Sequence, residues 1–238
     1  MTYSWNGYDG FKTDAQLTQA YYGAVHRCFE LALRRLLPED RVATALDIAC
    51  GSGQSTQVVG KFARKVIGVD SCEASIELAR NTEFAVDTQF VRSPFQEYET
   101  EDSYDLVCAA WFHSNLHSEE EQVAMAKKIC GLLRPGGKVC FVVPGESFTS
   151  RQMQVISQGM GWHQAWIEQV AEYTRGDFTF DNERWLRTTI WQPMHLLRVY
   201  RPWFELSCWD VKGTLVKEER LQPVCMEPPF EVLYGEVR

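Results

Sequence analysis

The sequence predicts an α/β fold built around a mainly parallel sheet. Short apolar runs typical of buried strands alternate with segments that have the spacing of amphipathic helices. A glycine-rich turn follows the first run, and the second run ends in a carboxylate, Asp70. Because parallel neighbours need a crossover connection, strands separated by helices imply a parallel arrangement. The predicted strands are 43–48, 66–70, 88–91, 104–110, 138–143, 204–211 and 230–237.

Three helices are predicted around these strands. The first spans Ala20 to Leu37, where apolar residues recur at helical spacing, and it stops at Pro38, which lacks a backbone donor. A second helix should begin just after Gly53. The third starts at the capping box Ser118–Glu121 and ends at the Pro-Gly-Gly turn 135–137. The acidic run after Ser118 is therefore a helix start and not a metal site.

The segment Leu46–Gln54, with the sequence LDIACGSGQ, predicts a nucleotide-cofactor site. Gly51 and Gly53 allow a tight turn and the close approach of a ligand. Asp70, at the end of the next strand, is placed to accept hydrogen bonds from ribose hydroxyls. A dinucleotide is disfavoured, because Thr56 stands where its fingerprint needs a third glycine.

Asp47 narrows the choice of cofactor. A carboxylate just ahead of the glycines would repel phosphate but could help to hold an ammonium group. S-adenosylmethionine (SAM) carries an ammonium and a sulfonium and has no phosphate. The residues of this loop therefore favour SAM over a pyrophosphate cofactor.

Four short stretches between Thr44 and Pro144 occur in the order and at the spacing of a known family. They are DIACGSG at 47–53, GVD at 68–70, YDLV at 104–107 and LRPGGK at 133–138. Together they resemble the first motif, the ribose-binding second strand, the fourth strand and the turn before the fifth strand of class I SAM-dependent methyltransferases. The chain departs from the family at Ala49, where glycine is frequent, and at Ser93, where an aspartate often reaches the adenine.

The resemblance implies a Rossmann-like sheet of seven mostly parallel strands, the last antiparallel, with helices on both faces. It also implies SAM as the cofactor and S-adenosylhomocysteine (SAH) as the product. The cofactor-binding residues that it implies are Asp47, Ala49, Cys50, Gly51, Gly53, Asp70, Ser71, Ser93, Pro94, Phe95, Ala110 and Trp111.

Length and the lack of a linker or repeat predict one domain of 238 residues. We divide it into an N-terminal lid and helix, a cofactor-binding core, a cap and C-terminal strands. These parts span residues 1–40, 41–145, 146–203 and 204–238. A formal charge of −8 and a pI of about 5.2 argue against nucleic acid as a substrate.

The sequence also disfavours a membrane or a metal ion as a partner. No run approaches the roughly 20 apolar residues of a membrane span, and no signal peptide is evident, which predicts a cytoplasmic protein. The eight cysteines have no Cys-x-x-Cys spacing and the five histidines do not cluster, so no metal is expected. A site for a soft metalloid, as in arsenic methyltransferases, finds no matching cysteine pattern.

Aromatic residues gather after the fifth strand and predict the acceptor site. Five of the eight tryptophans lie between Gly145 and Phe204, which indicates a helical, aromatic-rich cap inserted after that strand. Either these rings fill the core of the cap, or they cover a flat acceptor together with the N-terminal segment. The predicted acceptor-binding residues are Trp5, Tyr8, Trp111, His113, Trp162 and Trp191.

A general base is needed only if the acceptor must lose a proton. His113 is the first candidate because it follows the fourth strand, and His163 and His195 in the cap come next. The competing interpretation of each is a hydrogen-bonded structural histidine. His26 and His117 are expected to be structural.

These features predict a methyltransferase that acts on a small, planar or aromatic acceptor, with N-, O- or C-methylation left open. Similar enzymes with lids are frequent in secondary metabolism, so natural-product methylation is the specific hypothesis. Two alternatives remain: a protein or peptide methyltransferase, and a SAM-binding protein that transfers no methyl group. The absence of an Asn/Asp-Pro-Pro-Tyr motif further disfavours DNA bases as acceptors.

Overall fold

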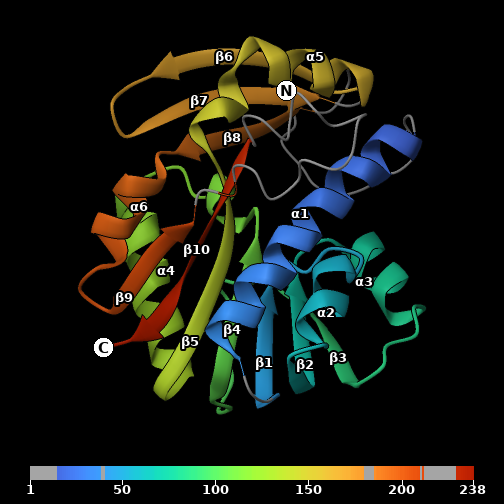
Figure 1. Cartoon of the computed structure of the whole chain (residues 1–238), viewed down its shortest axis with the longest axis vertical. Helices are drawn as coiled ribbons and strands as arrows, with labels where there is room; N and C mark the ends of the chain where they lie inside the picture. Colours follow the sequence, from blue (N-terminus) through green and yellow to red (C-terminus); the bar gives the residue numbers. More distant parts are fainter. Residues whose placement is uncertain (1–14, 39–40, 180–184, 210, 212–228) are drawn as a thin grey trace.

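The computed structural model describes residues 15–38, 41–179, 185–209, 211 and 229–238. A seven-stranded sheet forms its centre, and a three-stranded sheet lies beyond the carboxyl ends of the parallel strands (Figure 1). The central sheet contains β1 (Val42–Ile48), β2 (Ala63–Asp70), β3 (Asp87–Arg92), β4 (Tyr104–Ala110), β5 (Leu133–Pro144), β9 (Phe204–Trp209) and β10 (Phe230–Val237). The smaller sheet contains β6 (His163–Gln169), β7 (Tyr173–Thr179) and β8 (Trp185–Trp191).

The helices are distributed along the whole described chain. They are α1 (Ala15–Leu36), α2 (Gln54–Val59), α3 (Glu73–Arg80), α4 (Glu119–Leu132), α5 (Arg151–Gly159) and α6 (Pro193–Tyr200), with the short 3-10 helices η1 (Phe112–Asn115) and η2 (Glu146–Thr149). None of the helices among the described residues is long and apolar enough to cross a membrane.

The central sheet has the strand order β3-β2-β1-β4-β5-β10-β9. β1 pairs in parallel with both β2 and β4, whereas β10 runs antiparallel to β5 and β9. The predicted sheet of seven mostly parallel strands, with the last one antiparallel, is confirmed. This order brings the carboxyl ends of β1, β2 and β4 side by side, and ligands of open α/β sheets bind at such an edge.

Helices pack on both faces of the central sheet and bury two apolar clusters. On one face, α1 contributes Phe29 and Leu33, which pack with Val59 of α2. On the other face, Ile129 of α4 packs in a cluster with Tyr200 of α6. Strand side chains alternate between these clusters, so the strands are buried on both sides, as their nearly continuous apolar runs predict.

The predicted helical cap is wrong: the insert after β5 is mainly the three-stranded antiparallel sheet β6-β7-β8, with α5 as its helix. Phe178 pairs in register with Leu186, and both side chains are buried. β8 is rich in threonine, isoleucine and tryptophan, and such β-branched and aromatic residues suit a pleated, half-buried surface. The number of aromatic residues in this segment indicates a cap, but it does not show whether the segment forms helices or strands.

The boundary between α4 and β5 also differs slightly from the expectation. The capping box is present, since the Ser118 hydroxyl accepts from the Glu121 N–H at 3.2 Å and the Glu121 carboxylate accepts from the Ser118 N–H at 3.2 Å. The helix ends at Leu132, and β5 begins at once, before the Pro-Gly-Gly turn. Leu133 pairs with Tyr104, so the first residue of this segment already belongs to the sheet.

Candidate cofactor and acceptor site

The loop after β1 bends through three residues with positive φ: Ala49 at 55°, Gly51 at 53° and Gly53 at 89°. Gly53 caps the N-terminus of α2, and a Cβ there would lie 2.7 Å from the Phe84 ring. A Cβ on Gly51 would instead meet no atom within 4 Å. The backbone at Gly51 therefore borders open space, as the cradle of a ligand requires.

Asp70 joins the end of β2 to this loop. Its Oδ2 accepts the Gly51 N–H at 2.9 Å, and its Oδ1 accepts the Cys72 N–H at 2.8 Å. Burial raises the pKa of Asp70 above its ordinary value, while these backbone hydrogen bonds act in the opposite direction. Each oxygen of an ionised carboxylate can accept more than one hydrogen bond, so Asp70 retains acceptor capacity for ribose hydroxyls.

Asp47 lies beneath the loop and is fully buried. Its Oδ2 accepts hydrogen bonds from the hydroxyls of Ser55 at 2.7 Å and Thr56 at 2.6 Å, whereas its Oδ1 has no partner among the described residues. Burial raises the pKa of Asp47 to about 6. Asp47 thus ties the start of α2 to β1 and keeps one unused acceptor atom below the loop.

A cavity of about 390 Å³ opens at this edge of the sheet. It brings together ten of the residues that the sequence predicts for the cofactor or the acceptor, namely Ala49, Cys50, Gly51, Asp70, Ser71, Pro94, Phe95, Ala110, Trp111 and Trp162. Seven others do not line it, namely Asp47, Gly53, Ser93, His113, His163, Trp191 and His195. Trp5 and Tyr8 lie outside the described residues.

Comparison with known families shows which kind of domain contains this edge of the sheet. Residues 45–137 match the family described as "Methyltransferase domain", and this range contains the glycine loop, Asp70 and β4. The chain carries a class I SAM-dependent methyltransferase domain. The cofactor of this domain is SAM, and the open space over Gly51 and the acceptor capacity of Asp70 fit its methionine and ribose parts.

Individual relatives of this methyltransferase domain are distant. The curated cypemycin N-terminal methyltransferase of a Streptomyces species is 27% identical over 95 residues, which span 40% of this chain and 39% of the relative. The solved structure of the PH0226 protein from Pyrococcus horikoshii is 17% identical, with a TM-score of 0.69, and 94% of this chain and 97% of that chain are covered.

A further solved structure contains the product cofactor. It is the N-methyltransferase NodS from Bradyrhizobium japonicum in complex with SAH, which is 12% identical with a TM-score of 0.57 over 92% of this chain and 87% of that chain. At such low identities these likenesses show the fold alone. They extend the fold of the methyltransferase domain over most of the chain, beyond the segment that the family match covers.

None of the three histidines predicted as a base faces the cavity of the methyltransferase domain. His113 is buried in the core, where its Nε2 lies 3.0 Å from the Tyr200 hydroxyl, and burial lowers its pKa to about 3. His163 is exposed at the start of β6. His195 stacks on Trp191, with its Nε2 2.9 Å from a Glu119 carboxylate oxygen. These positions match structural histidines better than a general base.

The first helix contributes cavity residues that the sequence did not reveal as functional. Tyr21, Tyr22 and His26 of α1 all line the cavity. Tyr21 stacks on Trp111 and meets Trp162 edge-on, with ring centroids 6.3 Å and 6.1 Å away. The Tyr-Tyr pair with a histidine one turn later was visible in the sequence, but nothing in it indicated that α1 crosses the carboxyl edge of the sheet.

Trp111 forms the junction between the cofactor loop and the aromatic rings. It adopts a left-handed backbone conformation with φ 66°, which is unusual for a bulky side chain. Its backbone N–H donates to the Val142 carbonyl at 2.9 Å, and its ring contacts Phe148 and Phe230. The strained turn thus directs the indole from the end of β4 into the cavity wall.

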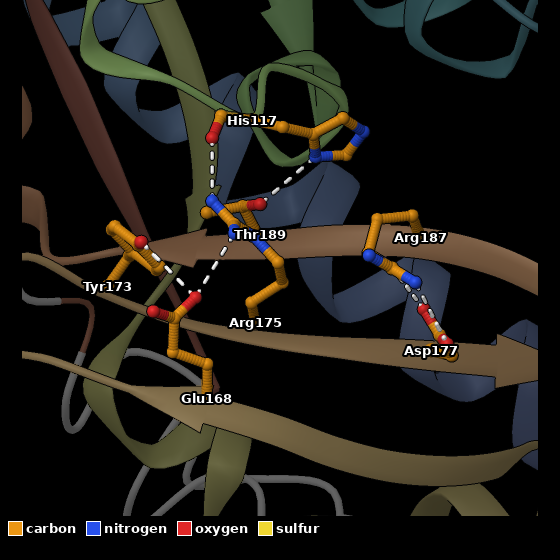
Figure 2. Close-up of polar contacts among 7 residues, drawn as sticks. All are labelled: His117, Glu168, Tyr173, Arg175, Asp177, Arg187 and Thr189. Atoms are coloured by element: carbon orange, nitrogen blue, oxygen red, sulfur yellow. Dashed lines mark hydrogen bonds and ion pairs between the residues drawn. The ribbon is translucent and has the colours of Figure 1, made fainter.

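Polar contacts fasten the insert sheet to the segment after η1 (Figure 2). Arg175 of β7 donates to the His117 carbonyl at 2.7 Å and pairs with Glu168 of β6 at 3.0 Å. The Thr189 hydroxyl of β8 lies 3.0 Å from His117 Nδ1. Burial lowers the pKa of His117; the nearby Glu121 carboxylate opposes this shift, and the Arg175 guanidinium adds to it. A neutral ring is therefore favoured at this junction.

Trp191 extends this attachment into the core. Its indole N–H donates to the buried Leu116 carbonyl at 2.7 Å. We call the set of Arg175, Thr189 and Trp191, together with the segment 116–117 that they bind, the clasp. Ser114 and Asn115, which line the cavity, directly precede this segment. Trp191 is consequently a structural anchor of the insert and not part of the cavity wall.

Proposed function

We propose that this protein transfers the methyl group of SAM to a small, planar or aromatic molecule and releases SAH. The observation that carries the proposal is a cavity that is lined both by the glycine loop and Asp70 and by a group of aromatic rings. The rings come from three parts of the chain, and they are Tyr21, Tyr22, Trp111, Phe148, Trp162 and Phe178. Such rings bury large apolar areas of a flat ligand at a low cost in side-chain entropy.

The size of the cavity favours a small acceptor. About 390 Å³ is near the lower end of the roughly 300–1,000 Å³ that is usual for small-molecule sites, and the cofactor must occupy part of this volume. An extended protein segment needs an open groove, whereas residues of α1 and of the insert line this cavity together with residues at the strand ends. A metabolite of the kind methylated in secondary metabolism is therefore the acceptor class that we favour, and a cytoplasmic location would suit it.

The chain's own residues would align the acceptor and exclude water. SAM supplies a methyl group activated on a sulfonium, and in-line displacement leaves a neutral thioether, so positioning is the main task of the protein. The Tyr21 hydroxyl is buried and has no partner among the described residues. Burial raises its pKa well above the ordinary value, so Tyr21 remains a neutral O–H that can donate to a polar atom of the acceptor.

A peptide N-terminus is the second candidate acceptor. It is suggested by the name of the curated relative, which methylates the N-terminus of a peptide, although the match spans only 39% of that protein. A single N-terminal residue could enter the cavity in the same way as a small amine. A small acceptor would fit entirely inside the cavity. A peptide would place only its N-terminal residue there, and the rest of its chain would lie outside.

Methyl-labelled SAM distinguishes these functions. The purified protein is incubated with it and either a metabolite extract or a library of peptides with free N-termini, and SAH and labelled products are measured by mass spectrometry. We expect SAH together with labelled small molecules. Labelled peptides alone would favour the second candidate, whereas bound SAM without SAH in either mixture would identify a protein that only binds the cofactor.

The Tyr21→Phe variant then tests the acceptor side of the cavity. With the acceptor so identified, we expect kcat/KM to fall by about tenfold or more, because a buried hydrogen bond is lost, while SAH affinity is retained. Tyr173→Phe is the matched control, since the Tyr173 hydroxyl donates to the exposed Glu168 at 3.3 Å and lies outside the cavity. Equal effects of the two variants would contradict the role of Tyr21.

A further inference from the structure

We propose that His26 binds the α-carboxylate of SAM and of SAH as an imidazolium. The inference concerns the cofactor and not the acceptor, so it does not depend on which molecule is methylated. It follows from the charges that line the cavity, from the place of His26 beside the glycine loop and from the surroundings of its ring.

The described cavity residues offer the cofactor's carboxylate no permanent cation. Neither lysine nor arginine is among them, and Asp70 is their only carboxylate. A buried carboxylate needs a charged partner or several hydrogen bonds to offset its desolvation. Among these described residues, His26 is the only side chain that can gain a positive charge near neutral pH.

His26 lies where the amino-acid end of the cofactor is expected. It borders the cavity together with Gly51, Ser52 and Gln54 of the glycine loop and the start of α2. His26, Ser52 and Gln54 also line a second, open depression between α1, α2 and α3. His26 therefore borders both spaces, next to the glycine loop and the start of α2.

Among the residues that the structure describes, none forms an ion pair with the ring of His26. Burial lowers its pKa to about 4, and no neighbouring charge contributes to this shift. On its own helix it is close to the Tyr22 ring, with centroids 6.4 Å apart. Lys61, which lines the second depression, is paired with Glu30 of α1 at 2.7 Å. From β2, Asp70 faces the cavity but is engaged by two backbone N–H groups.

A carboxylate beside the ring would reverse this preference for the neutral form. An opposite charge within hydrogen-bond distance raises the pKa of a histidine, so the bound state takes up a proton that the free protein lacks at neutral pH. Affinity should then be highest below the pKa of the bound state and fall as the pH rises through it. Ligand binding coupled to proton uptake is the signature of the proposal.

Calorimetry with SAH tests this signature on the unaltered protein. Titrations between pH 6 and 8 in phosphate and in Tris, whose heats of ionisation differ, measure the protons taken up on binding. We expect net uptake by the wild-type protein and none by His26→Gln. Absence of uptake in the wild-type protein would overturn the proposal, even if the variant failed to fold.

A second ligand separates the carboxylate from the rest of the cofactor. 5′-Methylthioadenosine has the adenosine and the thioether of SAH but no carboxylate. His26→Gln should weaken SAH binding by about tenfold or more, because a charge-assisted hydrogen bond is lost, and leave 5′-methylthioadenosine binding within about twofold. Equal losses for both ligands would mean that His26 only shapes the wall, and the proposal would be rejected.

His163→Gln is the matched control variant. It makes the same substitution at an exposed histidine of β6 that does not line the cavity. It should bind SAH as the wild-type protein does and keep the same proton uptake. If the wild-type protein bound no SAH at all, the assignment of the cofactor would be contradicted. A loss of SAH binding that is confined to His26→Gln would instead support the role of His26.

Discussion

The location of Asp70 follows from the sequence, whereas the direction of the His113 side chain does not. The last residue of a parallel strand lies at the carboxyl edge of the sheet, so the position of Asp70 beside the glycine loop follows from the chain order. His113 follows β4 at the same edge, but it sits in η1, and its ring turns into the core against Phe141 at 4.8 Å. The direction of a side chain in such a short turn depends on what packs around it.

Asp70→Ala should weaken SAM binding by about 2 kcal/mol or more, because hydrogen bonds from ribose hydroxyls to a charged acceptor are lost. Calorimetry measures this directly. Ser93→Ala is the control, since the Ser93 hydroxyl donates to the Pro94 carbonyl at 2.9 Å and does not line the cavity. Unchanged SAM affinity in a folded Asp70→Ala protein would refute the ribose assignment, and a large loss in Ser93→Ala would restore a role in adenine binding.

His113 should make the protein sensitive to acid. Its pKa is about 3 in the folded protein and ordinarily 6.5, so between these values the unfolded chain binds more protons. Stability should therefore fall as the pH drops below 6.5, by up to about 1.4 kcal/mol per pH unit. Asp47 acts oppositely, because its pKa is raised to about 6 and protonation favours the folded state.

Urea unfolding of the wild-type protein and of His113→Gln at pH 7, 6 and 5 isolates this contribution. Both proteins retain Asp47, so their difference reports the histidine. The variant should be less stable at pH 7, where it loses the contact with Tyr200, but it should lose less stability on acidification. Parallel pH profiles would contradict the assignment of a buried, neutral His113.

Among the elements, the strands of the central sheet were the most predictable. β4 and β10 have the predicted bounds, because short runs rich in apolar residues are a local signal of a buried strand. The capping box predicted the start of α4 in the same local way. The insert was not predictable from its aromatic content, since its three strands are stabilised by pairing with one another and by the clasp.

The contribution of the clasp to stability can be measured at the hydrogen bond of the Trp191 indole N–H. Trp191→Phe leaves the buried Leu116 carbonyl without its 2.7 Å partner, which should cost about 1–3 kcal/mol of stability beyond the change in packing. Hydrogen exchange should rise in the segment 112–117 and stay unchanged in β1 and β2.

Trp166→Phe is the matched control for the clasp. The Trp166 indole N–H is buried and has no hydrogen-bond partner among the described residues, so this substitution removes a donor without breaking a bond. We expect it to cost less than Trp191→Phe and to leave exchange in 112–117 as it is. If both variants destabilised the protein equally, packing rather than the hydrogen bond would explain the effect.

At the scale of the whole molecule, the cavity joins three parts that are distant in the sequence. Its lining residues come from α1, from the glycine loop and the end of β4, and from the insert. Figure 1 shows α1 and the insert near the carboxyl ends of the parallel strands. A ligand bound between these parts should stabilise all of them together, because it binds the folded state and not the unfolded chain.

SAH should accordingly raise the thermal stability of the protein. At a concentration of about one hundred times its Kd, the expected gain is about 2.7 kcal/mol, which for a chain of this size corresponds to a rise in Tm of several degrees. Differential scanning calorimetry with increasing SAH checks this. A Tm that stayed constant at saturating SAH would show that the cavity does not bind the cofactor in the folded protein.

The sequence by itself determined the class of fold and the cofactor, and it predicted that Gly51 and Asp70 lie together at the carboxyl edge of the sheet. Each depends on neighbours in the chain: a strand, a turn without Cβ atoms and a carboxylate at the next strand end. Only the tertiary structure decided that Tyr21 and His26 face the cavity, that His113 and Trp191 do not, and that the insert is a sheet. These outcomes depend on how α1 and the insert pack over the strand ends, through contacts between residues far apart in the chain that no local pattern encodes.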